Sequence, residues 1–291
     1  MSAGLLLAAG GSILFSGKAI VIKLAYRYGV DAETLITLRM LFAFPFFAAA
    51  LWWTSRRAPR LTAADHVRLV LIGLLGYYAA SYLDFLGLQY ITAALERLIL
   101  YLNPTVVLLM SALFLARRIG GLDALALMLS YGGIVLAFWH DVRFDSERAG
   151  LGALLVFGAT LCYAVYLVVA GEIVARIGAI RLASYAICIS TLAVLIQFAA
   201  MRPLAALAQP APVLWLSVIN AIACTLLPVF MSMMAVARIG ASNVALMAMV
   251  GPVSTIVLGY ALLDEPISGW QLGGTALVLA GVFVLSLKAR S

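Results

Sequence analysis

Six ionisable side chains lie inside long apolar stretches of this sequence, where a charge is costly in lipid and usually serves a function. They are Lys18, Lys23, Arg39, Asp84, Glu96 and Arg97. One hypothesis is a gate near one membrane surface, with Lys23, Arg39 and Asp84 as its candidate residues. When this gate is closed, the carboxylates of Asp84 and Glu96 are expected to pair with nearby cations. The expected partners are Lys23, Arg39 or Arg97.

The remaining charged residues are candidates for contact with a substrate. Lys18 lies nearer the middle of its apolar stretch and could meet a substrate carboxylate. Glu96 and Arg97 are neighbours on a predicted helix, so they point about 100° apart and cannot satisfy each other directly. The alternative interpretation of all six residues is snorkelling and static pairing that only hold helices together. No carboxylate is expected near the middle of a span, which favours facilitated export or exchange over strongly coupled uptake.

Aromatic and amide side chains provide a second set of candidates. Tyr78 and Tyr82 share one face of a predicted helix, as Arg97 and Tyr101 share a face of the next. Tyrosine rings can hold an ammonium group by cation–π attraction as well as an apolar side chain, and an amino acid needs both contacts. Two later helices add polar or flexible side chains, namely Asn220, Asn243 and Met247. Packing between helices is the competing explanation for each.

The elements that must position these residues are membrane-spanning helices. Of the 291 residues, 65% are hydrophobic and only 11% are charged, and apolar stretches of membrane-crossing length follow one another with short breaks. The sequence therefore predicts an all-α membrane protein. We expect ten spans, over residues 3–26, 34–53, 67–88, 92–115, 122–139, 150–172, 180–201, 213–236, 240–263 and 269–287.

The formal charge of +7 does not indicate nucleic-acid binding, because the basic residues gather at the ends of spans. Eleven Lys and Arg residues outside the spans fall on the side of the termini and four on the other side, so both ends are expected in the cytoplasm of a bacterial inner membrane. The short connections leave no room for a nucleotide-binding domain. Three cysteines in apolar runs and two distant histidines predict neither a metal site nor a cofactor.

The sequence also repeats itself at an offset of 148 residues. Pro104 corresponds to Pro252, and Gly133 corresponds to Gly281. Two units of five spans each, over 1–145 and 146–291, must enter the membrane in opposite directions, which is the inverted-repeat plan of secondary transporters. We expect the two repeats to surround a central cavity. Pro104 and Pro252 are candidate hinges, with static kinks as the alternative.

The second half has the motifs Gly251-Pro252-Val253, Leu263-Asp264-Glu265 and Ala280-Gly281-Val282, together with Gly259, Gln271 and Gly274. In these residues the sequence resembles the ten-helix EamA type of the drug/metabolite transporter superfamily, and Lys23 and Arg39 also look like that family's residues. The first half departs from the family pattern, because Arg117-Arg118 replaces the usual acidic residue. The resemblance implies a basket of helices around a central cavity and alternating access between the halves.

The resulting prediction is a secondary transporter, not an enzyme, that exports small organic metabolites, with amino acids, including aromatic ones, as the expected substrates. Its expected partners are a small-molecule substrate and membrane lipid, and a homo-oligomer is a further candidate. Two alternatives stay open, namely a sugar-phosphate or nucleotide-sugar exchanger and a membrane subunit without transport activity. An intramembrane enzyme would need a nucleophile–base pair or a metal cluster within the spans, and the sequence shows neither.

Overall fold

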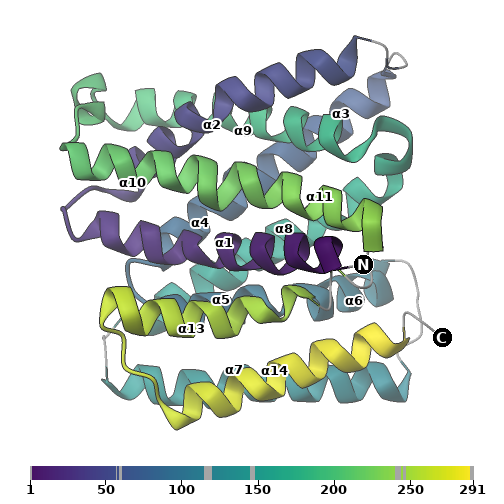
Figure 1. Cartoon of the computed structure of the whole chain (residues 1–291), viewed down its shortest axis with the longest axis vertical. Helices are drawn as coiled ribbons and strands as arrows, with labels where there is room; N and C mark the ends of the chain where they lie inside the picture. The colour runs from purple at the N-terminus through teal and green to yellow at the C-terminus, as the bar shows by residue number, and fades with distance from the viewer. Residues whose placement is uncertain are drawn as a thin grey trace.

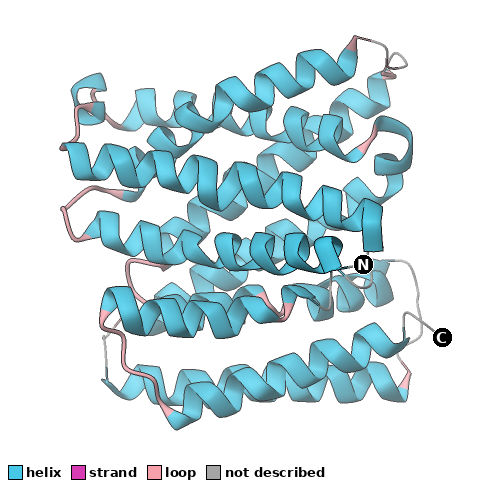
Figure 2. Ribbon diagram, viewed as in Figure 1, coloured by secondary structure: helices cyan, strands magenta, loops and turns pink. Residues whose placement is uncertain are grey.

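The computed structural model describes residues 2–56, 58, 61–114, 120–144, 148–239, 244 and 247–288. Its described part contains helices and loops without a strand (Figure 2). The first half consists of α1 (Ser2–Tyr26), α2 (Ala32–Ser55), α3 (Ala63–Ile72), η1 (Gly73–Ala79), α4 (Ala80–Gly87), α5 (Ala93–Leu100), α6 (Asn103–Phe114) and α7 (Gly121–Phe144). The second half consists of α8 (Ala149–Ile177), α9 (Ala179–Met201), η2 (Leu204–Leu207), α10 (Ala211–Ala221), η3 (Ile222–Leu226), α11 (Leu227–Ile239), α13 (Val250–Leu263) and α14 (Gly269–Lys288).

These helices run back and forth across one bundle and confirm the predicted ten spans (Figure 1). Within the described residues, seven helical rods are long and apolar enough to cross a membrane, and shorter apolar helices supply the rest. The start of α1 and the end of α14 lie at the same end of the bundle, which we call the terminal end. We call the opposite end the far end.

The polarity of the bundle is inverted relative to that of a water-soluble protein. Leu6, Trp53 and Leu154 are between 70% and 73% exposed on its outer surface. Charged and hydroxyl-bearing side chains, such as Glu96 and Ser190, are instead completely buried. This arrangement suits a lipid solvent, because lipid solvates apolar side chains and penalises charges.

The packing of α7 against α14 shows the twofold relation between the repeats (Figure 1). A Cβ atom on Gly133 would lie 2.6 Å from the carbonyl oxygen of Gly274, and one on Gly281 would lie 2.8 Å from that of Ala126. Ala126 and Gly274 are themselves separated by the repeat offset, as Gly133 and Gly281 are. Each half therefore offers the other the same surface, as in a contact across a twofold axis.

Gly133→Leu is expected to destabilise this helix pair by about 1–3 kcal/mol, because a side chain there would collide with the backbone of α14. The matched control is Gly132→Leu, since a Cβ atom on Gly132 would meet nothing within 4 Å. The measurement is the temperature at which the purified protein stops eluting as a single species in gel filtration. Equal effects of the two substitutions would contradict this packing.

Two spans are interrupted by π-helical segments that the sequence analysis did not predict. Each segment lies at the matching position of its repeat, η1 within the α3–α4 span and η3 within the α10–α11 span. Gly76 of η1 faces the ring of Tyr166, and Cys224 of η3 faces Gly17, where an added Cβ atom would be 3.5 Å from its Sγ atom. Segments of this kind are frequent at functional sites because they change which side chains face inward.

The spans predicted over 92–115 and 240–263 are not single continuous helices. In the first repeat α5 ends at Leu100 and α6 begins at Asn103, and in the second repeat α13 begins only at Val250. Pro104 and Pro252 therefore lie in the first turn of α6 and α13, where a missing N–H group costs little. Both prolines mark helix breaks, so they stay candidate hinges.

Candidate functional site

Five charged residues meet inside the bundle and form what we call the buried charge cluster. They are Lys18 of α1, Arg39 of α2, Asp84 of α4, and Glu96 and Arg97 of α5. The Nζ atom of Lys18 lies 2.6 Å from Oδ2 of Asp84 and 3.3 Å from Oε1 of Glu96. All five side chains are buried, with Glu96 fully shielded from solvent. Three buried cations thus lie near two buried carboxylates.

The sequence-based prediction of the partners in this cluster was wrong. It paired Asp84 and Glu96 with Lys23, Arg39 or Arg97, whereas Lys18 is the cation that contacts both carboxylates. The reason is tertiary, because α1 packs beside both α4 and α5 and the long lysine side chain reaches between them. Lys18 is therefore already neutralised and is a poorer candidate for a substrate carboxylate than the sequence suggested.

The two arginines of the cluster have no carboxylate within ion-pair distance among the described residues. Arg39 donates from Nη2 to the hydroxyl of Ser81 at 3.0 Å, and its guanidinium carbon lies 5.0 Å from the centre of the Phe85 ring. Arg97 lies 4.8 Å from the ring centre of Phe15. Aromatic faces stabilise these cations without cancelling their charge.

Arg97 also lies beside the helix break of the second repeat. Its guanidinium carbon is 5.3 Å from the ring centre of Tyr101, and a Cβ atom on Gly251 would lie 2.8 Å from its Nη2 atom. Only glycine leaves space for this close approach. Phe15 is 41% exposed, so the ring that contacts Arg97 is also accessible from outside the protein interior. No sequence signal distinguished this phenylalanine from its apolar neighbours.

Hydroxyl groups from the first repeat donate hydrogen bonds to backbone carbonyls at the helix break in front of α13. Pro252 has no N–H group, which leaves the carbonyl of Ala248, four residues earlier, without its usual helical donor. Ser12 donates a hydrogen bond to this carbonyl at 3.1 Å, and the hydroxyl of Tyr101 donates a second one. Ser16 donates to the carbonyl of Gly251 at 3.0 Å. These bonds can be remade with water when the helices move, as a hinge requires.

Combining Ser12→Ala with Tyr101→Phe is expected to destabilise the protein by about 1–3 kcal/mol, because both side-chain donors to the half-buried Ala248 carbonyl are lost. The control is Ser254→Ala, whose hydroxyl bonds only to Val250 in its own helix. Thermal unfolding of the purified variants measures the difference. A double variant as stable as the control would show that the break does not depend on these bonds.

Lys23 joins the two halves at the far end. Its Nζ atom lies 2.9 Å from Oε1 of Glu265 and donates to the carbonyl of Ile91 at 2.8 Å. Glu265 also accepts hydrogen bonds from the backbone N–H of Ala93, at 3.1 Å to each oxygen, where α5 begins. A carboxylate is stabilised at the N-terminus of a helix. The predicted partners of Lys23 were Asp84 or Glu96, and the sequence could not show which connection would bring Glu265 here.

Arginines add further links between the halves at the far end. Arg27 donates to the carbonyl of Leu263 at 2.7 Å, and Arg202 lies 3.3 Å from Oε2 of Glu33. Together these groups tie residues of one repeat to residues of the other at the far end. We call the set the far-end gate, with members Lys23, Arg27, Asp31, Glu33, Arg202 and Glu265.

Asp31 caps the helix that carries Glu33. Its carboxylate accepts hydrogen bonds from the N–H and the hydroxyl of Thr34, at 2.8 and 3.0 Å. Partial burial favours its neutral form, but these bonds and the charge of Arg202, 3.7 Å away, outweigh that effect and lower the pKa of Asp31 below its usual value. This member of the gate therefore stays ionised at neutral pH.

The predicted tyrosine pair lies next to the far-end gate. The rings of Tyr78 and Tyr82 are stacked with centroids 6.4 Å apart, which confirms that they share one helix face. The hydroxyl of Tyr82 donates to Oε1 of Glu33 at 3.1 Å. This bond links Tyr82 directly to a carboxylate of the far-end gate.

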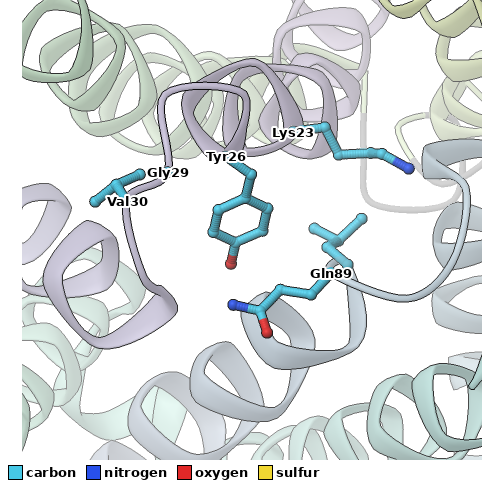
Figure 3. Close-up of a pocket in the computed structure, with 6 residues that line it drawn as sticks. Lys23, Tyr26, Gly29, Val30 and Gln89 are labelled. Atoms are coloured by element: carbon cyan, nitrogen blue, oxygen red, sulfur yellow. The ribbon is translucent and has the colours of Figure 1, made fainter.

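A pocket of about 310 Å³ opens at the far end beside these residues. Its lining includes Lys23, Tyr26, Leu88 and Gln89. Figure 3 shows the hydroxyl of Tyr26 and the amide of Gln89 close together, whereas the ammonium of Lys23 points away from them toward the other side. The Tyr26 hydroxyl donates to the carbonyl of Phe85 at 2.7 Å, next to Asp84 in the sequence. The pocket is thus connected through Tyr26 to the backbone of α4 next to Asp84.

The remaining predicted substrate contacts are less well defined. Asn220 is fully buried, and neither atom of its amide finds a hydrogen-bond partner in the described part of the chain. Met247 is half-buried just before the break at α13. Asn243 lies outside the described residues. The structure therefore leaves Asn220 as a polar group that a solute or a moving helix could satisfy.

Comparison with known proteins shows which family has this architecture. The model of the EamA-like transporter family matches the chain twice, over residues 2–139 and 150–287. The chain belongs to the EamA-like transporter family. Similar curated proteins are the "uncharacterized transporter YcbK" of Bacillus subtilis, 28% identical over 96% of this chain and 92% of that protein, and an "uncharacterized transporter" of Archaeoglobus fulgidus, 24% identical over 95% and 94%.

A solved crystal structure shares the fold of this EamA-like transporter, with a TM-score of 0.67 and 18% sequence identity over 100% of this chain and 98% of that one. Membership in the family makes the protein a multi-pass membrane transporter of small molecules. Each family match covers five spans, in agreement with two inverted repeats.

Proposed function

We propose that this EamA-like transporter carries zwitterionic metabolites, namely amino acids including aromatic ones. The observation that carries the proposal is Arg97, a buried guanidinium without a carboxylate partner in the described chain, held against the aromatic rings of Phe15 and Tyr101. Arginine recognises a carboxylate through paired hydrogen bonds, and the rings provide apolar area beside it. An amino acid presents both kinds of group to such a site.

The transport cycle that fits this site is alternating access. The ion pairs of the far-end gate are formed in this structure, and their release would expose the cluster to the far end. Rocking of the two inverted repeats would close the far end and open the terminal end in turn. The positive-inside bias supports termini in the cytoplasm of a bacterial inner membrane, so that export carries the solute from the terminal end to the far end.

Counterflow in proteoliposomes tests the proposal. Vesicles containing the purified protein are loaded with unlabelled amino acids and then given one labelled amino acid at a time. Saturable, protein-dependent uptake is expected for at least one of them. Arg97→Gln is expected to lower this uptake by about tenfold or more, because a charge-assisted hydrogen bond to the solute is lost.

The matched control is Arg68→Gln, which breaks an ion pair of 3.6 Å with Glu172 between two half-exposed side chains. It is expected to transport normally. If no amino acid exchanges although the protein is folded, the substrate assignment is wrong. Exchange of sugar phosphates in the same vesicles would then favour the second candidate, which the excess of cations over carboxylates in the cluster also suits.

A further inference from the structure

Glu96 occupies an unusual position for an ionised carboxylate. It is fully buried, and no described group donates a hydrogen bond to either of its oxygens. Lys18 lies 3.3 Å away without hydrogen-bond geometry, because its ammonium bonds to Oδ2 of Asp84 at 2.6 Å. Oδ1 of Asp84 is also without a donor in the described chain. Burying a carboxylate in this way is costly unless it is neutralised.

A proton on Glu96 would remove its charge and supply a hydrogen-bond donor to a carboxylate oxygen that lacks one. A protonated carboxyl group donates one hydrogen bond, and the two carboxyl groups are neighbours, because Nζ of Lys18 lies 2.6 Å from Asp84 and 3.3 Å from Glu96. Two acids held together in a dry site commonly share one proton, since both cannot be charged at once. The Glu96 hydroxyl would then bond to Asp84, and Lys18 would neutralise the carboxylate that remains.

Other charged and titratable groups surround the pair on every side. Arg97 follows Glu96 on α5, and Arg39 of α2 faces Asp84. The hydroxyl of Tyr26 faces Asp84 from α1, and the thiol of Cys224 in η3 faces Lys18 and Arg39. Glu265 lies at the start of α5, where Lys23 neutralises it. A change in the charge of Glu96 is therefore felt first by Lys18, Asp84 and Arg97.

We propose that Glu96 is a proton-binding site, shared with Asp84, from which the ammonium group of the solute displaces the proton. The inference rests on the proposed function for the identity of the solute. Because Glu96 and Arg97 are adjacent on α5, a zwitterion can place its carboxylate at Arg97 and its ammonium at Glu96. The O–H bond of Glu96 then breaks, and the proton passes to water at the open end.

This competition makes the protein a proton–solute exchanger. Glu96 holds either a proton or the solute ammonium, so one proton crosses the membrane in one direction for each solute that crosses in the other. The inward proton gradient of a bacterial membrane would drive export. The sequence-based expectation of facilitated export arose because no carboxylate was predicted near the middle of a span, whereas the structure buries two carboxylates with one lysine.

Infrared difference spectroscopy tests the proton without any knowledge of the solute. The purified protein at neutral pH is expected to show the carbonyl stretch of a protonated carboxylic acid. Glu96→Gln is expected to remove this band, and Asp264→Asn, at a side chain 90% exposed, is expected to leave it unchanged. Absence of the band from the wild-type protein, or its survival in Glu96→Gln, would overturn the proposal whatever the protein transports.

The exchange is tested in the proteoliposomes that show counterflow. With an acidic lumen, the amino acid that exchanges is expected to accumulate inside, and a proton ionophore is expected to abolish the accumulation. Whatever transport remains in Glu96→Gln should no longer respond to the pH gradient. Counterflow without a response to pH, or accumulation only with an acidic exterior, would overturn proton exchange while the proposed function stands. Absence of counterflow would refute the proposed function, and the infrared band alone would then decide the proton site.

Discussion

Lys18→Met is expected to destabilise the protein by about 3–5 kcal/mol, more than any other single substitution in the buried charge cluster. The lysine is the only described cation that contacts both Asp84 and Glu96 at ion-pair distance, and its removal leaves the buried carboxylate of Asp84 without its ion-pair partner. Methionine keeps the length of the side chain and removes the charge. The measurement is thermal or denaturant unfolding of the purified protein in detergent.

Two further variants separate the charge from the packing. Arg68→Met removes an ion pair of half-exposed side chains and is expected to cost less than about 1 kcal/mol. Adding Asp84→Asn to Lys18→Met should restore most of the stability, because the protonated Glu96 then faces a neutral amide. If Lys18→Met is no less stable than Arg68→Met, the cluster does not depend on its central lysine.

Opening of the far-end gate is expected to expose Cys224 to thiol reagents. This thiol is buried beside Lys18 and Arg39, so its modification reports access to the cluster. Lys23→Ala removes the partner of Glu265. If that pair stabilises the closed state by about 1.4 kcal/mol, the open population and the labelling rate rise about tenfold.

The experiment uses protein in which Cys162 and Cys188 are replaced by serine, so that only Cys224 can react. Glu265→Gln should have the same effect as Lys23→Ala, because the ion pair has two partners. Arg68→Ala, which breaks a surface pair elsewhere, should leave the rate unchanged. Unchanged labelling in both gate variants would mean that these residues do not control access.

The far-end gate is asymmetric between the repeats. Glu265 corresponds to Arg117 in the first repeat, and Lys23 corresponds to Gly171 in the second. Arg117 lies outside the described residues, but an arginine cannot accept the N–H groups of a helix terminus as Glu265 does. Glu33 corresponds to Arg181, which donates to the hydroxyl of Ser55 at 3.3 Å at the terminal end. The inverted repeats thus share a fold but carry different side chains at their corresponding ends.

Much of the fold could be predicted from the sequence because lipid imposes simple rules. Apolar stretches of membrane-crossing length give the number of spans, and the offset between Pro104 and Pro252 gives the repeat. The shared helix face of Tyr78 and Tyr82 followed from helical spacing, whereas the stacking of their rings is a finding of the structure. The six buried or gate charges were also recognisable, because few other ionisable residues lie within the apolar stretches.

The partners of those charges depended on the tertiary structure. Helical spacing says which residues share a face but not which helices become neighbours, so it could not show that Lys18 reaches Asp84 and Glu96. The same limit hid Phe15 beside Arg97, Ser12 at the carbonyl freed by Pro252, and Glu265 at the start of α5. The sequence by itself determined which groups are buried in the membrane. Only the packing of distant helices decided which of them neutralise one another and which stay available to a proton or a solute, because these contacts join residues far apart along the chain.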